Sequence, residues 1–362
     1  MKKNIILIFF IVFAIMCTAT GCTNYSDLQP MVFSGSSDQK ISEGGTYVLS
    51  GNLSDAKLVI DTKQKVYLQL DGVSINNARG PAIQVVNAKK LTVTVNEGTK
   101  NEITDGGKSK AALSSDCKII FEGKGELRIN GNKEHGIQSK EGITINDADL
   151  IINAVKDGIK AKESIIINEG NINIEEAVEG MESKNKILIK GGSLTVNARD
   201  DGISAENDIT IAGGEVYLSA LKGDAIDSNG TIHISGGNTI AIGSQMPEAS
   251  IDCNENDFII KGGTITGAAG STSTPTAELS TQISVILKGA NEGEVISISS
   301  ESGEIMTFTS PRTFDTLIFS SPEIVEGETL TVKVEGKERE KVTVRSMVIK
   351  QGENSEKSNQ AR

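Results

Sequence analysis

The chain has 362 residues, of which 37% are hydrophobic and 23% charged, a composition typical of a folded protein rather than a disordered one. Its 36 basic and 48 acidic residues give a net charge of −12, which argues against nucleic acid as a partner because phosphates require a basic surface. Aromatic residues make up only 4% and tryptophan is absent, so a bound glycan would need polar or ionic contacts rather than stacking on rings.

Residues 1–21 have the pattern of a secretory signal. A basic start precedes an apolar run at residues 5–16, which is too short to span a bilayer comfortably. The sequence Ala-Thr-Gly then stands directly before Cys22, as in a bacterial lipobox. We therefore expect a lipoprotein that is anchored to the membrane at the cell surface through a lipid on Cys22, with a plain secretory signal as the alternative. The polar residues 22–40 predict a tether.

Residues 41–270 are predicted to form a parallel β-helix. Its clearest repeat is a 22-residue unit that opens on Gly136, Gly158, Gly180 and Gly202. Pairs of β-branched or Leu residues, separated by one polar residue, recur at fixed offsets from each Gly, which is the period-two pattern of short strands. A fixed period near 20 residues is typical of a β-solenoid, in which each repeat is one coil and only stacked coils bury a core. Between residues 99 and 110 the spacing lengthens, which predicts a projecting loop.

The C-terminal part has a different organisation. A shift in composition at residues 268–275 predicts a linker or loop that ends the solenoid. Residues 276–348 alternate without the 22-residue period and predict a small antiparallel β region, which would cover the open end of the solenoid. The polar residues 349–362 predict a disordered tail.

One column of the repeat carries charge. The residues before the opening positions include His135 and a series of acids, and stacked coils would place these side chains about 5 Å apart. Like charges at that spacing repel unless a cation lies among them, and Ca²⁺ accepts about six to eight oxygen ligands in loose geometry. The sequence thus predicts a calcium site with these candidate ligands: Asp157, Glu179, Asp200, Asp201, Asp224, Asp227 and Asp252.

Two simpler explanations of this column remain open. Asp-Gly is a common turn dipeptide, because Asp bonds to the local backbone and Gly adopts positive φ. Neighbouring lysines would also neutralise the acids without a metal. Lys160, Lys162, Lys184 and His135 are in addition the candidate contacts to a substrate. A zinc centre is not expected, because no second histidine stands near His135 in the repeat.

Several motifs resemble those of one known family: Tyr47-Val-Leu-Ser-Gly-Asn-Leu, Leu68-Gln-Leu-Asp-Gly-Val-Ser-Ile, Gly80-Pro-Ala-Ile, Asp157-Gly-Ile-Lys-Ala-Lys and Asp201-Gly-Ile-Ser-Ala-Glu. Across residues 30–345 the chain resembles the secreted bacterial carbohydrate-binding β-helix family, which is structurally akin to pectate lyases. The resemblance implies a right-handed, single-stranded parallel β-helix that binds calcium. It also implies plant cell-wall ligands, especially acidic ones such as polygalacturonate (pectin), and also cellulose. Family calcium sites would correspond to Asp157, Asp201 and Asp224, while the number of ions stays open.

The leading prediction is a monomeric, non-catalytic protein that is anchored at the surface and binds acidic polysaccharide through calcium. An alternative is a calcium-dependent polysaccharide (pectate) lyase, in which Lys160, Lys162 or Lys184 would abstract the C5 proton of a uronate. A structural adhesin or spacer with protein partners is the second alternative.

Overall fold

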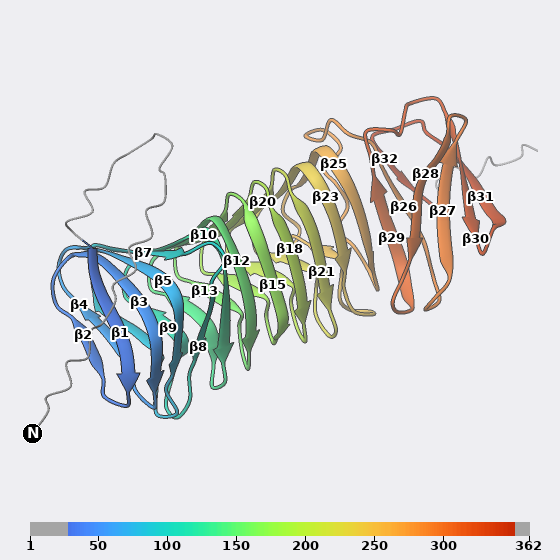
Figure 1. Cartoon of the computed structure of the whole chain (residues 1–362). Coiled ribbons are helices and arrows are strands. Elements are labelled where there is room, and N and C mark those ends of the chain that lie inside the picture. Colours follow the sequence, from blue (N-terminus) through green and yellow to red (C-terminus); the bar gives the residue numbers. More distant parts are fainter. Residues whose placement is uncertain (1–27, 352–362) are drawn as a thin grey trace, which may run out of the picture.

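The computed structural model describes residues 28–351, which contain strands and turns but no helix (Figure 1). Their main body is an elongated parallel β-solenoid of about 10 coils, and an antiparallel β region follows at its C-terminal end. The predicted all-β fold class, a parallel solenoid with a small C-terminal antiparallel region, is therefore confirmed. The predicted signal with Cys22, and residues 352–362 of the predicted tail, lie outside the described residues.

Two sheets form the walls of the solenoid. Sheet A has 18 strands: β1 (Leu28–Gly35), β3 (Gly45–Ser54), β5 (Lys65–Asn76), β7 (Lys90–Val95), β8 (Lys100–Thr104), β10 (Ile119–Gly131), β12 (Ile143–Ala154), β14 (Ser164–Ile167), β15 (Gly170–Ala177), β17 (Lys186–Ile189), β18 (Ser193–Ala198), β20 (Asp208–Ile211), β21 (Glu215–Ala220), β23 (Ile232–Ile242), β25 (Phe258–Ala269), β26 (Ser284–Ala290), β29 (Phe314–Ser320) and β32 (Val348–Lys350). Sheet B has 10 strands, one from each coil: β2 (Gln39–Ile41), β4 (Leu58–Asp61), β6 (Ile83–Asn87), β9 (Ala111–Ser115), β11 (His135–Ser139), β13 (Ile159–Ala161), β16 (Met181–Ser183), β19 (Ile203–Ala205), β22 (Ile226–Ser228) and β24 (Ile251–Asp252).

The apolar residues of the repeat form columns that run through the core. Ile137, Ile159, Met181 and Ile203 pair in register in sheet B, and all four side chains are fully buried. Because side chains alternate along a strand, their polar neighbours point outward in columns of their own. Burial of each such side chain stabilises the fold by about 1.5–3 kcal/mol. The predicted register is confirmed, and it fixes which polar residues meet on the outside.

Glycine pairs allow each coil to turn within sheet A. Gly192 has a φ of +80°, and a Cβ atom there would lie 2.4 Å from the carbonyl oxygen of Gly170 in the preceding coil. Gly214 repeats this positive φ one coil later. Only glycine permits both the left-handed backbone and this close stacking of corners.

At the N-terminal end the structure corrects the predicted tether. Within residues 22–40, β1 and most of β2 are strands of the solenoid, and β1 pairs in parallel with β3 from Leu28 to Gly35. The polar composition of this stretch was misleading because an end strand has only one neighbour and buries few side chains, chiefly Phe33. The solenoid thus begins before residue 41.

Two other predicted irregular stretches also contain strand. Of the predicted loop at residues 99–110, residues 100–104 form β8, which pairs with β5 and β10. Its inward positions are Asn101 and Ile103, so a buried polar residue hid the apolar alternation. Ala268 and Ala269 of the predicted linker are the last residues of β25.

The C-terminal region closes one end of the solenoid. β29 pairs antiparallel with β25 and β26, so the edge of the last coil is covered. A separate cap sheet of four strands follows: β27 (Val295–Ser300), β28 (Gly303–Thr309), β30 (Thr329–Val334) and β31 (Lys337–Thr343). Arg312 fastens this region to an earlier coil, since its guanidinium donates to the Ala220 carbonyl and to Ser219 Oγ, the latter at 2.6 Å.

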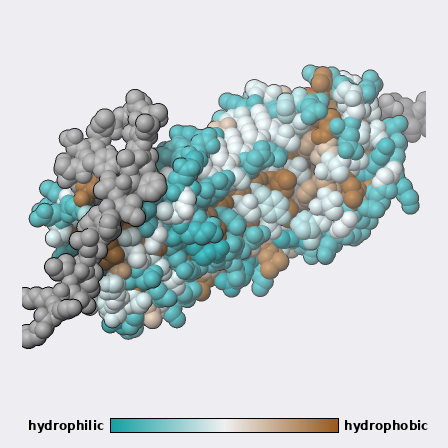
Figure 2. All heavy atoms as spheres, viewed as in Figure 1, coloured by the Kyte–Doolittle hydropathy of each residue, from teal (hydrophilic) through white to brown (hydrophobic). Residues whose placement is uncertain are grey.

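The surface seen in Figure 2 is mainly hydrophilic, and apolar residues form scattered patches rather than one continuous face. Residues 28–351 include no helix with the length and hydropathy of a membrane span.

Candidate metal and polysaccharide site

The candidate site occupies two neighbouring columns of polar residues associated with sheet B. In the first column, backbone N–H groups of the opening glycines donate to the acidic residues of the next coil, as from Gly158 to the Glu179 carbonyl at 2.9 Å and from Gly180 to the Asp201 carbonyl at 3.0 Å. The second column lies two residues after each opening position and pairs in register as Lys160, Glu182, Ser204, Asp227 and Asp252. Coil stacking therefore brings acids from different repeats together.

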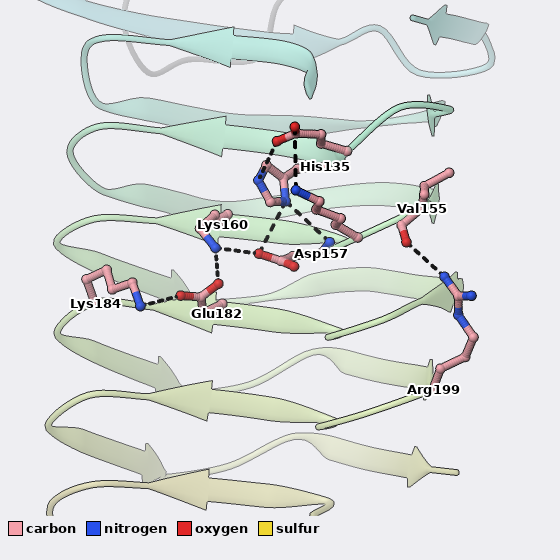
Figure 3. A network of polar contacts seen from close by, with 9 residues as sticks. His135, Val155, Asp157, Lys160, Glu182, Lys184 and Arg199 are labelled. Carbon is pink, nitrogen blue, oxygen red and sulfur yellow. Dashed lines mark hydrogen bonds and ion pairs between the residues drawn. The ribbon is translucent and has the colours of Figure 1, made fainter. Parts of the chain in front are cut away.

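The first group of acids, the lysine-neutralised cluster, consists of Asp157, Glu179 and Glu182. Carboxylate oxygens of all three lie within 4.8 Å of one another. Lys160 is positioned between two of them, with its Nζ 2.8 Å from Asp157 Oδ2 and in contact with Glu182 (Figure 3). Lys184 Nζ approaches Glu182 Oε1 at 2.7 Å from the other side. Two ammonium groups therefore already balance part of the negative charge of this cluster.

His135 is a buried neighbour of the same cluster and contacts Asp157. Its Nδ1 lies 3.2 Å from Asp157 Oδ2, and its side chain is only 6% exposed. Burial disfavours the Asp157 carboxylate, but its interactions with His135, Glu182 and Lys160 outweigh this effect and lower the pKa of Asp157 below its usual value. His135 is therefore buried beside Asp157, whose backbone N–H donates to its Nδ1, and little of its side chain is exposed.

Glu179 is the poorly compensated member of the lysine-neutralised cluster. Burial, reinforced by the carboxylates of Asp157 and Glu182, raises the pKa of Glu179 to about 8. Its carboxylate has no ion-pair partner within the described residues. Glu179 is consequently the acid in this cluster that is most readily protonated.

The lysines differ in what they can do chemically. Although burial opposes it, contact with Asp157 and Glu182 raises the pKa of Lys160, and hydrogen bonds to Glu182 and Glu206 raise that of Lys184. A general base at neutral pH requires a lowered pKa, so these two lysines are poorly suited to abstract a proton. Lys162 is exposed and forms no ion pair in the described part of the chain, so it is free to contact a ligand.

The second group, the open cluster, consists of Asp224, Asp227 and Asp252. Carboxylate oxygens from these three residues also lie within 4.8 Å of one another. Asp227 and Asp252 are paired on consecutive coils, while the backbone N–H of Ala249 donates to Asp224 Oδ1. No Lys, Arg or His of residues 28–351 lies within ion-pair distance of these carboxylates. Within the described chain, the open cluster is therefore a group of acids without a counter-charge.

Electrostatics at the open cluster reflect this lack of positive charge. Burial, with contributions from Asp201, Asp252 and Asp227, raises the pKa of Asp224 to about 7. Burial and the nearby Asp252 also raise the pKa of Asp227. An all-oxygen donor set on adjacent coils suits a hard cation such as Ca²⁺, which would relieve the same repulsion. By donor chemistry, these residues fit the predicted metal.

The remaining predicted ligands lie beside these clusters. Asp201 accepts a hydrogen bond at 2.9 Å from the Asp224 N–H, and burial raises its pKa to about 6. Asp200 is exposed and belongs to neither cluster. The seven predicted ligands therefore fall into two groups with two acids beside them. Glu182 was absent from that set, although it has the same offset from its opening Gly as Asp227 has from Ala225.

Comparison with known proteins places this solenoid in a class. The family model described as carbohydrate-binding domain-containing protein matches residues 36–186 and 175–337, which is most of the chain. The chain therefore belongs to this family of carbohydrate-binding domain-containing proteins, and the resemblance drawn from its motifs is confirmed.

Two individual proteins are similar to this chain. A carbohydrate-binding domain-containing protein of Acetivibrio thermocellus is 28% identical over 127 residues, which are 32% of this chain and 44% of that protein. The matched region thus spans less than half of that relative. A solved structure of the polysaccharide lyase-like protein from C. thermocellum, a gadolinium derivative, is 21% identical with a TM-score of 0.45, and the match covers 68% of this chain and 93% of that one.

Proposed function

We propose that this protein is a non-catalytic, surface-anchored binder of acidic polysaccharide such as polygalacturonate, and that it acts through calcium held at the open cluster. Membership of the carbohydrate-binding family supports a polysaccharide ligand. The net charge of −12 supports a cationic intermediary, because an acidic protein would otherwise repel a polyanion.

One observation carries the proposal: Asp224, Asp227 and Asp252 converge without any basic partner in the described chain, whereas the similar lysine-neutralised cluster has Lys160. A calcium ion held by these three residues would supply the positive charge that uronate carboxylates require. The protein's part is to fix three carboxylates on two stacked coils, so that few side chains lose conformational freedom on binding.

Two lysines, one on β13 and one directly after it, complete the proposed surface. Lys160 neutralises acids that would repel a polyanion, and Lys162 offers an exposed ammonium to a uronate carboxylate. Exposed ion pairs of this kind contribute little individually, at about 0–1 kcal/mol each, so the calcium-dependent contact dominates.

The experiment is electrophoresis through a gel containing polygalacturonate, with either calcium or a chelator. We expect calcium-dependent retardation of the wild-type protein and loss of that retardation in Asp227→Asn and Asp252→Asn. Asp149→Asn is the matched control, since it removes an equivalent charge from sheet A. Retardation that persists in chelator and in both variants would remove the open cluster from the mechanism.

Two further outcomes separate the alternatives. Release of ultraviolet-absorbing unsaturated uronides from polygalacturonate would establish a lyase and contradict the non-catalytic proposal. The absence of glycan binding at any calcium concentration would leave the adhesin or spacer. Surface anchoring is tested separately, by mass spectrometry of the mature N-terminus for a lipid on Cys22.

A further inference from the structure

The first coils of the solenoid carry a group of lysines that no acid neutralises. They lie at the corner where each coil passes from sheet B to sheet A, and this basic patch consists of Lys63, Lys65, Lys89, Lys90 and Lys118. No Asp or Glu of residues 28–351 lies within ion-pair distance of these five side chains, whereas the neighbouring Lys40 pairs with Asp61 at 3.1 Å. The patch therefore has positive charge available for an outside partner.

Stacking of the coils arranges three of these lysines as a ladder. Lys65 pairs in register with Lys90 on the next coil. The backbone N–H of Leu91 donates to the Lys118 carbonyl at 3.0 Å, so Lys118 continues the column one coil later. Neighbouring strands are about 4.8 Å apart, and like charges placed opposite one another at this spacing repel. An anionic surface along the ladder would relieve that repulsion.

The patch has the opposite sign to the protein as a whole, whose net charge is −12. The two acidic clusters lie on later coils, from β13 to β24. The column of the ladder also changes sign along the axis, because its later positions include Asp208, which pairs with Lys186, and Asp257. Charge is thus separated along the solenoid, and the positive end consists of the first coils.

The chain enters the solenoid beside the patch. Leu28, the first residue of β1, pairs with Thr46, which in turn pairs with Tyr67 on the following coil. Lys90 Nζ lies 5.8 Å from the centroid of the Tyr67 ring. The strands β1, β3 and β5 that carry this row form the N-terminal end of the solenoid (Figure 1). The entry point is therefore two strand spacings, about 10 Å, from the ring that Lys90 contacts.

This position matters if the protein is anchored through Cys22, and in that respect the inference rests on the proposed function. Leu28 follows Cys22 by only six residues, and a chain extends by at most about 3.6 Å per residue. A lipid on Cys22 would thus hold the entry point within about 22 Å of the bilayer. Lysine and tyrosine side chains suit the headgroup region, and a basic patch strengthens the attachment that a lipid begins.

We propose that the basic patch binds the headgroups of anionic phospholipids and holds the first coils against the membrane surface. The ammonium groups of the ladder would contact lipid phosphates, and Tyr67 would lie at the level of the headgroups. The anchor would deliver the patch to this partner, which favours a bilayer over a soluble polyanion.

The test is sedimentation of the mature chain from residue 22, made without its lipid, with phospholipid vesicles in chelator. This chain contains every residue that the structure describes. We expect binding at low salt to vesicles that contain phosphatidylglycerol and phosphatidylcholine in equal parts, and little binding to phosphatidylcholine alone. High salt should abolish the binding, because exposed charges are screened.

Two matched variants locate the binding surface. The ladder variant combines Lys65→Gln, Lys90→Gln and Lys118→Gln, and it should bind about tenfold more weakly or less, since each lysine near an anionic surface contributes about fivefold. The distal variant combines Lys186→Gln, Lys190→Gln and Lys261→Gln and should bind like wild type. Its three lysines are exposed, form no ion pair in the described chain and lie on later coils, so the net charge of the two variants is equal.

The outcomes are distinct from those for the calcium site. Equal binding to both kinds of vesicle, or equal losses in the ladder and distal variants, would overturn the proposal. So would a ladder variant that keeps vesicle binding but loses retardation by polygalacturonate, because the patch would then serve the polysaccharide. Should the ladder variant fail to fold, Lys63→Gln with Lys89→Gln decides the matter. Chelator and the missing lipid exclude the open cluster and Cys22 from this test, so its failure would leave the proposed function standing.

Discussion

The lysine-neutralised cluster and the open cluster use the same two columns of the solenoid but solve the problem of repulsion differently. In the first, Lys160 precedes Glu182 in the second column and contacts acids of both columns. In the other, Ser204 precedes Asp227 and Asp252, and no ammonium group of residues 28–351 forms an ion pair with these acids. The backbone is equivalent in the two places, so one side chain per coil decides whether an ammonium group lies among the acids.

Replacing Lys160 removes the ammonium group that distinguishes the lysine-neutralised cluster from the open cluster. Lys160→Met leaves Asp157 and Glu182 without the ammonium they share, and we expect the free energy of unfolding in chelator to fall by about 3 kcal/mol, because a buried charge loses its partner. Calcium should restore part of this loss by turning the cluster into an open one. Thermal unfolding with calcium and with chelator measures both effects. Lys162→Met is the control, and equal stability of the two variants would contradict the role of Lys160.

Replacing Asp227 removes one of the three acids of the open cluster and so tests whether they bind calcium. A cation that binds only the folded protein stabilises it by about 2.7 kcal/mol at a concentration of about 100 times its Kd. We expect such an increase for the wild-type protein and its loss in Asp227→Asn, whose remaining acids repel less but bind calcium poorly. Calorimetric unfolding with and without calcium is the measurement. A calcium-induced shift that survives the substitution would place the ion elsewhere.

Glu179 gives the lysine-neutralised cluster a dependence on pH. Its folded-state pKa of about 8 lies above the ordinary value of 4.5, so the unfolded chain releases its proton first and stability falls as pH rises between these values. Glu179→Gln is uncharged throughout. We therefore expect it to be more stable than wild type by about 1 kcal/mol above pH 8, after allowance for solvent screening, and equally stable near pH 4. Denaturant unfolding in chelator across this range checks the sign, and a constant difference would contradict the assignment.

The smallest effect is expected at Lys162, which is exposed and without an ion pair in the described chain. Lys162→Ala should change stability by less than about 0.5 kcal/mol. Binding to polygalacturonate in calcium should weaken about two- to fivefold at low salt, and this loss should vanish at high salt because the charge is screened. Gel retardation at two salt concentrations measures this loss of binding. Unchanged binding would show that Lys162 is not part of the ligand-binding surface.

The fold was predictable where inward residues repeat strictly. The register follows directly from one inward column, because only one alignment of the coils buries Ile137, Ile159, Met181 and Ile203 together. The strands β1 and β8 were missed because they have few apolar inward residues, and pairing with neighbours defines them instead. A single sequence does not show such long-range pairing.

The site was predictable in part. The acidic column and its lysines were visible in the repeat, but sequence offsets did not show which acids Lys160 reaches. That depends on the conformation of a long side chain and on the contact between His135 and Asp157. Glu182 was recoverable from its offset, because it stands at the same position in its repeat as Asp227 does two coils later.

The regular stacking of coils also gives the surface a unit of length. Equivalent side chains recur at one strand spacing, about 4.8 Å, along the axis of the solenoid. A linear polymer aligned with this axis meets corresponding groups at constant steps, and a polymer with another step falls out of phase after a few units. The pitch of the solenoid therefore favours linear ligands whose own repeat matches the spacing of its coils.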